Sequence, residues 1–391
     1  MDISGIEYNP GALFLNIPIY NRFDHTNISE LVIKLKYEGS ERALHSPDIK
    51  PHARGTLVIH MEDWNPDKEI LLEFFTGEDR LVDKYAIKSK TEFQWSGGDE
   101  PGEPVQIEDD DKHLVIICEG NTRVIINRST GLIKEIQRPS GTFLISGPVL
   151  NLRTKGNPVI YGFHKIKEYY SDWILEHFSY RADNNEVIIT SNGKYAELPD
   201  IEIEMIIRSD GLLTCSYQLG KAPDEYIREV GIMFELDSDL DSLSWKRDPY
   251  WSHYPAGHLS APEGKVSLYS GVPTAYRSAP EKKWIHDTKS FYYGGSGDEA
   301  INEELTHIAR ATKEHIREYN LCKNGEHVLS VLGRGDVSCR IALADNGILL
   351  FANNKMDYVD LEWGNFQKNI KLDDDYSDEI VFKIHMHSAD P

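Results

Sequence analysis

Residues 200–220, DIEIEMIIRSDGLLTCSYQLG, decide the fold because they predict two β-strands joined by a tight turn. Apolar runs stand on both sides of Asp210-Gly211, and an Asp-Gly pair between two such runs is a strong signal of a β-hairpin. Similar runs at 113–120, 122–131 and 186–193 also end in glycine-containing turns. We therefore expect a long series of antiparallel strands.

The first part of the chain, residues 11–95, contains shorter strand-like runs separated by turn residues. Leu31, Ile33, Leu35 and Tyr37 alternate with residues that would lie on the opposite face of a strand. The spacing between successive runs is close to that of a β-sandwich. This part is therefore predicted to be a small sandwich of its own.

Helical patterns are rare, and the best candidate is Asp298–Arg310, where apolar residues recur at helical spacing. No alternation of strands and helices is visible, which argues against a parallel barrel or a doubly wound sheet. The segment 96–112, SGGDEPGEPVQIEDDDK, is rich in Gly, Pro and acid and reads as a linker. We predict an all-β protein with a small β-sandwich at 1–95 and a much larger antiparallel sandwich at 113–391.

The composition limits the classes of partner. The chain has 391 residues, a formal net charge of −22 and 40% hydrophobic residues. So acidic a surface repels nucleic acid and anionic membranes, whereas neutral ligands remain compatible with it. No apolar run is long enough to span a membrane, and the N-terminal residues do not resemble a secretion signal. We expect a soluble protein, and its compartment stays open.

The cysteines predict no disulfide framework. Cys118, Cys215, Cys322 and Cys339 are far apart in the sequence and form no C-x-x-C pair. Cys118 and Cys215 lie in strand-like apolar runs, where buried free thiols are the usual outcome.

Motifs in the first sandwich suggest a family. Residues 14–61 contain Asn21-Arg22-Phe23, then Thr26-Asn27, then the turn PDIKP at 47–51. In this order they resemble the immunoglobulin-like sandwich that follows the catalytic barrel in β-galactosidase-type enzymes of glycoside hydrolase family 2.

Motifs in the second part agree with this resemblance. Residues 127–154 contain a Thr-Gly hairpin at 130–132 and the run GPVLNLR at 147–153. They look like the start of the large C-terminal β-sandwich of the same enzymes, a fold shared with galactose mutarotases. There are departures, since Leu152 stands where such enzymes usually have tryptophan.

The resemblance implies a non-catalytic region. The family's sugar-binding N-terminal domain and its (β/α)₈ barrel, which carries both catalytic glutamates, have no counterpart in this sequence. Retaining hydrolysis needs two carboxylates about 5 Å apart, and no such pair can be nominated among the acidic residues. We predict no catalytic residue and no glycosidase activity from this chain alone.

Metal and cofactor signals are weak. The acidic run at 108–112 is predicted to be a flexible linker, and 237–242 lacks the glycine that a calcium loop needs. His385 and His387 alternate on one strand face, which we interpret as solvated rather than metal-binding. No metal site and no cofactor are predicted.

The best candidate for ligand contact is the aromatic stretch WKRDPYWSHYP at 245–255. Trp245 ends a strand and is expected to pack inside the sandwich. Sugars stack their C–H faces on aromatic rings, while acids, amides and histidines hydrogen-bond the hydroxyls. The predicted carbohydrate contacts are Asp248, Tyr250, Trp251, His253, Tyr254, His258 and Glu263.

Three hypotheses for the function remain. The leading one is the C-terminal, non-catalytic portion of a β-galactosidase-like hydrolase, which supports a catalytic barrel in cis or on a separate large chain and rims a site for a galactoside-like sugar. Its other expected role is in homo-oligomer contacts. The alternatives are a free-standing carbohydrate-binding module and, with His253 and Glu263 as acid and base, an aldose epimerase-like enzyme.

Overall fold

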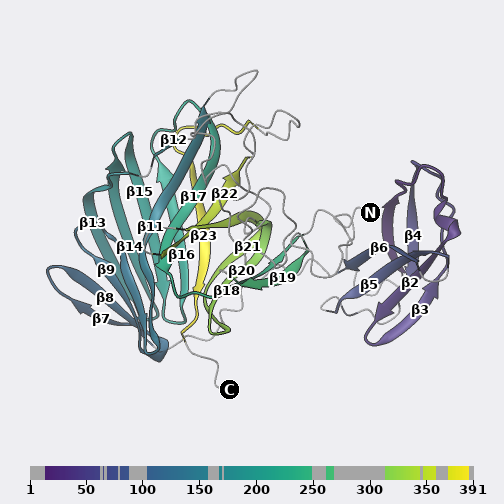
Figure 1. Ribbon diagram of the computed structural model, residues 1–391, viewed down its shortest axis with the longest axis horizontal. Coiled ribbons are helices and arrows are strands. Elements are labelled where there is room, and N and C mark those ends of the chain that lie inside the picture. The colour runs from purple at the N-terminus through teal and green to yellow at the C-terminus, as the bar shows by residue number, and fades with distance from the viewer. Residues whose placement is uncertain are drawn as a thin grey trace, which may run out of the picture. The chain divides into compact units, whose positions relative to one another are not determined.

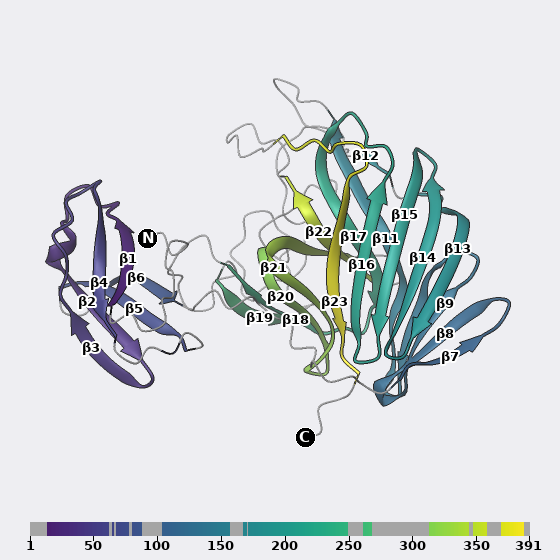
Figure 2. The ribbon, with the colours of Figure 1, turned by 180° about the vertical axis from the view of Figure 1, so that it is seen from behind.

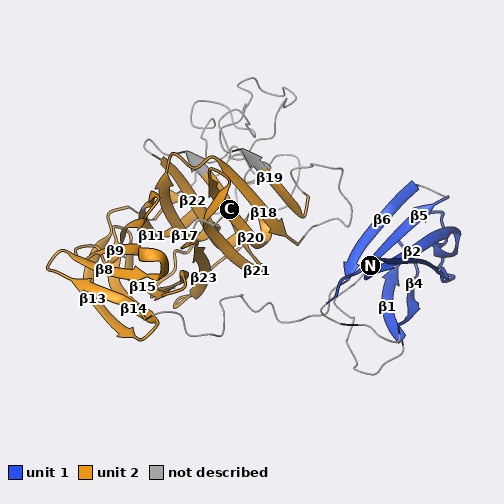
Figure 3. Ribbon diagram, turned by 90° about the horizontal axis from the view of Figure 1, so that it is seen from below, with its two compact units in different colours: residues 1–96, 250–256 blue, residues 97–249, 257–391 orange. Residues whose placement is uncertain are grey.

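The structure is a computed structural model. It describes residues 14–61, 65, 68–77, 80–87, 104–156, 167–169, 171–248, 261–267, 313–343, 347–357 and 369–386. The chain divides into two compact units, which Figure 3 shows in separate colours. Unit 1 comprises residues 1–96 with 250–256, and unit 2 comprises residues 97–249 with 257–391.

Unit 1 is built from two antiparallel sheets (Figure 1). Its elements are β1 (Phe14–Tyr20), the 3-10 turn η2 (Ile28–Glu30), β2 (Leu31–Tyr37), β3 (Ser40–Leu44), β4 (Arg54–His60), β5 (Ile70–Thr76) and β6 (Arg80–Ile87). Strand β1 pairs with β4, and the second sheet has the order β3-β2-β5-β6.

The predicted alternation in unit 1 is confirmed. In β2, Leu31, Ile33 and Leu35 are buried, whereas Val32 between them is exposed. Strand β1 alternates in the same way over its seven residues. The inward residues of both sheets form one apolar cluster, so each sheet buries one face against the other.

The Asn-Arg-Phe motif acts as a polar corner of this sandwich. Asn21 is 1% exposed, and its Nδ2 donates to the carbonyl oxygens of Thr26 at 2.9 Å and Ile49 at 2.8 Å. Its Oδ1 accepts from the backbone N–H of Phe23 at 3.0 Å. Asn27 Oδ1 accepts from the backbone N–H of Ile49 at 3.0 Å. The three motifs that carry the family resemblance in this unit therefore form one hydrogen-bonded corner.

Unit 2 consists of antiparallel strands. Its elements are β7 (Gln106–Asp109), β8 (His113–Cys118), η3 (Glu119–Asn121), β9 (Thr122–Asn127), β10 (Leu132–Arg138), β11 (Gly141–Gly156), β12 (Lys167–Glu168), β13 (Ile174–Asp183), β14 (Glu186–Tyr195), β15 (Leu198–Arg208), β16 (Leu212–Leu219), β17 (Tyr226–Asp237), β18 (Ser242–Arg247), β19 (Glu263–Ser267), β20 (Lys313–Lys323), β21 (Glu326–Leu343), β22 (Gly347–Met356) and β23 (Ser377–Ile384).

Hydrogen bonds arrange these strands in two layers joined by the long strand β21. One layer runs β7-β8-β9-β10-β11-β17-β22, and β22 pairs with residues 338–343 of β21. The other runs β13-β14-β15-β16-β23, and β23 pairs with residues 329–332 of β21 (Figure 2). Strands β20, β18 and β19 extend from β21 in turn.

The two layers pack face to face around a large apolar core. Phe234 of β17 and Phe382 of β23 meet edge to face, with ring centroids 5.0 Å apart. Tyr195 of β14 reaches across, and its hydroxyl accepts from the backbone N–H of Leu150 in β11 at 3.1 Å. The all-β fold with large antiparallel sheets agrees with the prediction from the sequence.

The predicted linker at 96–112 is wrong in its second half. Residues 106–109 form β7, which pairs with β8. The acidic residues there are held by arginines of β9 and of the turn that follows it, partners that a local reading of charge cannot identify.

Other predictions from the sequence have different outcomes. The four cysteines are free and buried, as expected. The candidate helix at 298–310 lies outside the described residues. Within the described ranges, no helix is long and apolar enough to cross a membrane.

Replacing Asn21 with Leu tests the role of the polar corner. The change leaves two buried carbonyl groups and one N–H without a partner, so we expect unit 1 to lose about 2–4 kcal/mol of stability. Denaturant unfolding measures this loss. The matched control is Asn16→Leu on the exposed face of β1, which should leave the transition within about 0.5 kcal/mol. Equal effects of the two changes would contradict the assignment.

Candidate functional site

Two of the predicted contact residues lie in the described part of the chain. Asp248 directly follows β18, and Glu263 begins β19. Both stand at the same end of the paired strands β18 and β19, next to residues 249–260 in the sequence. The other predicted contacts lie outside the described residues; they are Tyr250, Trp251, His253, Tyr254 and His258.

Hydrogen bonds fix the residues on either side of this 249–260 segment. The backbone N–H of Arg247 donates to the carbonyl of Pro262 at 2.8 Å, and that of Asp248 donates to the carbonyl of His315 at 2.8 Å. The indole Nε1 of Trp245 donates to the carbonyl of Ala261 at 2.9 Å. The segment therefore starts and ends on a rigid base, which we call the loop clamp: Trp245, Arg247, Asp248, Ala261 and Pro262.

A bidentate ion pair between Arg317 and Asp248 completes the loop clamp. Arg317 Nε donates to Asp248 Oδ1 at 3.0 Å, and its Nη2 donates to Oδ2 at 2.7 Å. The side chain of Asp248 is 51% exposed and that of Arg317 35%, so the pair faces solvent on one side. Because both oxygens of Asp248 accept from one guanidinium, the carboxylate has a single orientation.

The backbone near this ion pair is unusually shaped. A Cβ on Gly335 would lie 2.4 Å from Asp248 Oδ2, and its φ of +92° suits glycine. His315 has a φ of +58°, at a point where the β20–β21 register shifts. Its Nδ1 lies 3.0 Å from the carbonyl oxygen of Gly335. Bulges of this kind re-aim side chains next to functional sites.

Trp245 is buried, as the sequence predicted, and is 3% exposed. Its ring packs on Gly264, where a Cβ would come within 2.3 Å of the ring. The ammonium of Lys313 lies 4.7 Å from the ring centroid. Trp245 is therefore a buried, packed member of the loop clamp.

A second polar group lies on the sheet β11-β17-β22-β21 and was not foreseen from the sequence. Leu150, Leu152, Val230 and Ile232 of these strands point into the core. The residues that alternate with them point to the opposite face, yet are at most 5% exposed. We call these residues the buried polar face: Asn151, Arg153, Glu229, Arg340, Phe351 and Asn353.

Glu229 is the centre of the buried polar face. Arg340 donates to both of its carboxylate oxygens, from Nε at 2.7 Å and from Nη2 at 2.9 Å. Arg228 Nη2 lies 3.7 Å from Glu229 Oε1, and Asn151 Nδ2 donates to Oε2 at 3.1 Å. Burial by itself would raise the pKa of Glu229, but the charges of Arg340, Arg228 and Arg153 outweigh it and hold the pKa well below its usual range. Glu229 is therefore ionised at neutral pH.

The arginines of this face also contact an aromatic ring. The guanidinium carbons of Arg340 and Arg153 lie 3.7 Å and 4.7 Å from the centroid of Phe351. Arg153 Nη2 is 3.0 Å from Glu168 Oε1 in β12. Charge and ring contacts together keep the long side chains in fixed positions.

The outer surface of β15, β16 and β23 bears an open concavity of about 340 Å³. Its lining includes Glu202, Glu204, Ser216, Gln218, Asp378 and Glu379. Asn192 donates to Glu202 at 2.7 Å and Tyr376 donates to Asp378 at 2.8 Å. Glu202 and Asp378 already have hydrogen-bond donors, and we assign no ligand to this surface.

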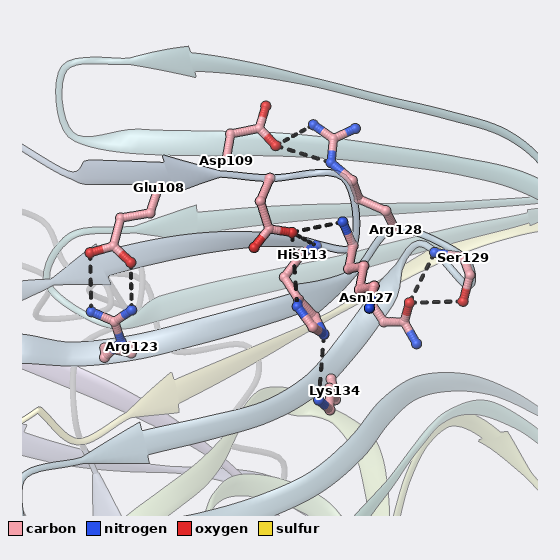
Figure 4. Close-up of polar contacts among 10 residues, drawn as sticks. Glu108, Asp109, His113, Arg123, Asn127, Arg128, Ser129 and Lys134 are labelled. Atoms are coloured by element: carbon pink, nitrogen blue, oxygen red, sulfur yellow. Dashed lines mark hydrogen bonds and ion pairs between the residues drawn. The ribbon is translucent and has the colours of Figure 1, made fainter.

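Ion pairs organise the edge formed by β7, β8 and β9 (Figure 4). Arg123 donates to both oxygens of Glu108, at 2.6 Å and 3.3 Å, and Arg128 Nε donates to Asp109 at 3.0 Å. Tyr180 of β13 donates its hydroxyl to Asp109 at 2.8 Å. The contacts join the edge strands of the two layers, so this acidic run is structural.

His385 is not on a solvated strand face, which corrects the prediction. Its Nε2 lies 2.8 Å from Ser330 Oγ, and its ring centroid is 5.4 Å from that of His327. Burial, together with the charges of His327, Lys383 and Arg138, lowers the pKa of His385 to about 4. His387 lies outside the described residues, among which no group of three or more potential metal ligands occurs.

Comparisons with known proteins place the chain in no family. No family model matches it, and no curated protein is similar to it. Among solved structures, an alpha-mannosidase from Enterococcus faecalis V583 is similar over 91% of this chain, with 11% sequence identity and a TM-score of 0.35. This chain covers 36% of that protein, so it spans about a third of its length. A likeness this weak carries no argument about activity.

Replacing Glu229 with Gln tests the buried ion pairs. The change leaves buried guanidinium groups without their carboxylate, and we expect a loss of about 3–5 kcal/mol in unit 2, measured by denaturant unfolding. Because the pKa of Glu229 is lowered in the folded state, its contribution is present above the unfolded value of about 4.3 and is lost as the pH falls below it. The variant should therefore lose less stability on acidification than the parent protein.

The exposed pair Arg123–Glu108 provides the control. Glu108→Gln should leave the midpoint of thermal unfolding unchanged, because solvent-exposed ion pairs contribute little. A Glu229→Gln protein as stable as this control would contradict the arrangement.

His385→Gln tests the second titrating group. Because its pKa is lowered from about 6.5 to about 4 on folding, the protonated form favours unfolding, and the native protein should lose about 2 kcal/mol between pH 7 and pH 5. The variant should lose that part of the pH dependence, as measured by urea unfolding at both pH values. An unchanged slope would show that His385 is equally accessible to protons in both states.

Proposed function

We propose that this chain is a non-catalytic region of a β-galactosidase-type glycoside hydrolase, which supports the catalytic barrel and lends residues 249–260 to the rim of its sugar site. The observation that carries the proposal is the loop clamp. The segment with Tyr250, Trp251, His253 and Tyr254 begins and ends on strands that are hydrogen-bonded to each other. A rigid sheet that presents an aromatic segment is a common arrangement for ligand contact.

The clamp supports this role energetically. Ordering a loop on binding costs free energy, and a loop with fixed ends has less freedom to lose. Asp248, oriented by Arg317, stands at the exit of the segment with half of its surface in solvent. It is therefore available to accept a hydrogen bond from a sugar hydroxyl while it stays paired.

The environments of the carboxylates support a non-catalytic role. A retaining glycosidase needs one carboxyl group that stays protonated near neutral pH and a second one about 5 Å away. Asp248 has both oxygens bonded to Arg317, and Glu229 has both bonded to Arg340. Each of these side chains is committed to an ion pair.

The test measures hydrolysis of nitrophenyl β-galactoside. The purified chain should show no turnover, and it should restore activity to a family 2 catalytic barrel that lacks its own C-terminal sandwich. Arg317→Met, which releases Asp248, should lower the restored kcat/KM about 3- to 10-fold through KM, because the rim of the site is less well positioned.

Arg123→Met is the matched control, because it also removes a two-pronged arginine–carboxylate pair and lies at the β7 edge. It should leave the restored activity unchanged. Hydrolysis by the chain alone would overturn the proposal. Oligosaccharide binding by the chain alone that is lost in Trp251→Ala, without any effect on a barrel, would favour a free-standing carbohydrate-binding module instead.

A further inference from the structure

We propose that the buried polar face holds an internal binding site for a small, neutral, hydroxylated molecule of the monosaccharide or polyol class. Asn151 and Asn353 provide its hydrogen bonds. Both side chains are 0% exposed. Each keeps one polar atom without a hydrogen-bond partner, Oδ1 of Asn151 and Nδ2 of Asn353. Buried polar atoms are nearly always satisfied, so two orphans on one bonded pair of side chains point to a missing partner.

The orientation of both amides follows from the charge of Glu229. Its carboxylate is ionised and can only accept, so the atom of Asn151 that faces it at 3.1 Å must be the donor Nδ2. The same Nδ2 donates to Asn353 Oδ1 at 2.8 Å. Flipping either amide would set two acceptors or two donors against each other. The two unpaired atoms are therefore an acceptor, Oδ1 of Asn151, and a donor, Nδ2 of Asn353.

The neighbouring charged groups already have partners, which favours a neutral ligand. Arg340 is paired with Glu229, and Arg153 with Glu168. Arg228 Nη2 lies 3.7 Å from Glu229, and its Nη1 donates to the carbonyl oxygen of Asp357. An anion or a cation bound here would bring an unmatched charge into a dry environment. Inorganic phosphate and simple amines should therefore be rejected.

A hydroxyl group fits an acceptor and a donor at the same time. Its O–H can donate to Asn151 Oδ1 while its oxygen accepts from Asn353 Nδ2. Phe351 belongs to the same face, and the guanidinium groups of Arg153 and Arg340 lie over its ring. Small sugars and polyols present hydroxyl groups without a net charge and therefore fit the unpaired acceptor and donor.

The experiment is calorimetric titration of the intact chain with D-galactose, D-mannose and glycerol, with inorganic phosphate as the charged comparison. We expect saturable one-to-one binding of at least one hydroxylated probe and none of phosphate. Asn353→Ala should weaken that binding at least tenfold. Thermal unfolding of both proteins with the same probe separates specific binding from the general stabilisation by sugars, which the variant retains.

Asn354→Ala is the control, because Asn354 is the next residue of the same strand and bonds instead to Tyr217 and to the carbonyl of Glu379. It should leave the affinity unchanged. Absence of saturable binding of all three hydroxylated probes to the parent chain overturns the inference, whether or not the variants fold. A crystal structure with only an ordered water between the two amides also overturns it.

The inference does not rest on the proposed function. Trp251→Ala should leave binding at the buried polar face intact, whereas Asn353→Ala should leave the complementation of a catalytic barrel intact. Failure of one proposal is thus distinguishable from failure of the other.

Discussion

The structure of unit 2 depends on the sharing of one strand between two layers. Strand β21 is hydrogen-bonded to β22 through residues 338–343 and to β23 through residues 329–332, so it joins the layers as a single sheet turned back on itself. The same strand supplies a residue to three of the polar groups described above. Arg340 pairs with Glu229, Gly335 lies against Asp248, and Ser330 contacts His385. A shift of one residue in its register would reverse the side chains of Arg340 and Ser330.

Buried polar residues fix the positions of turns and side chains that apolar packing alone does not determine. In unit 1, Asn21 satisfies backbone groups of two separate turns, and its loss would leave them buried and unbonded. In unit 2, Glu229 orients Arg340 and Asn151 by the same logic, with charge added. Such groups cost free energy to bury and are tolerated only where every bond is made, so they define one arrangement among many. Asn151 and Asn353 each keep one buried polar atom without a hydrogen-bond partner.

Much of the fold could be predicted because strand periodicity is a local signal. Leu31, Ile33 and Leu35 were identified as one buried face from their alternation alone, and Trp245 was expected inside because it ends a strand. Glu229 could not be found in this way. Its neighbours in YIREVGIMFELD suggest an ordinary outward charge, and its burial depends on Arg340, more than 100 residues away. The acidic residues at 108–109 were misjudged for the same reason, because their arginines lie beyond the local window.

The sequence by itself determined that this protein is all-β, where its hairpins turn and which aromatic segment is the candidate for sugar contact, because these properties depend on side-chain periodicity and on turn residues a few positions apart. Only the tertiary structure decided that Asp248 is clamped by Arg317, that Glu229 is a buried anion and that Asn151 and Asn353 share an unfinished hydrogen-bond network. These depend on which distant strands become neighbours, and on the dielectric environment that their packing creates.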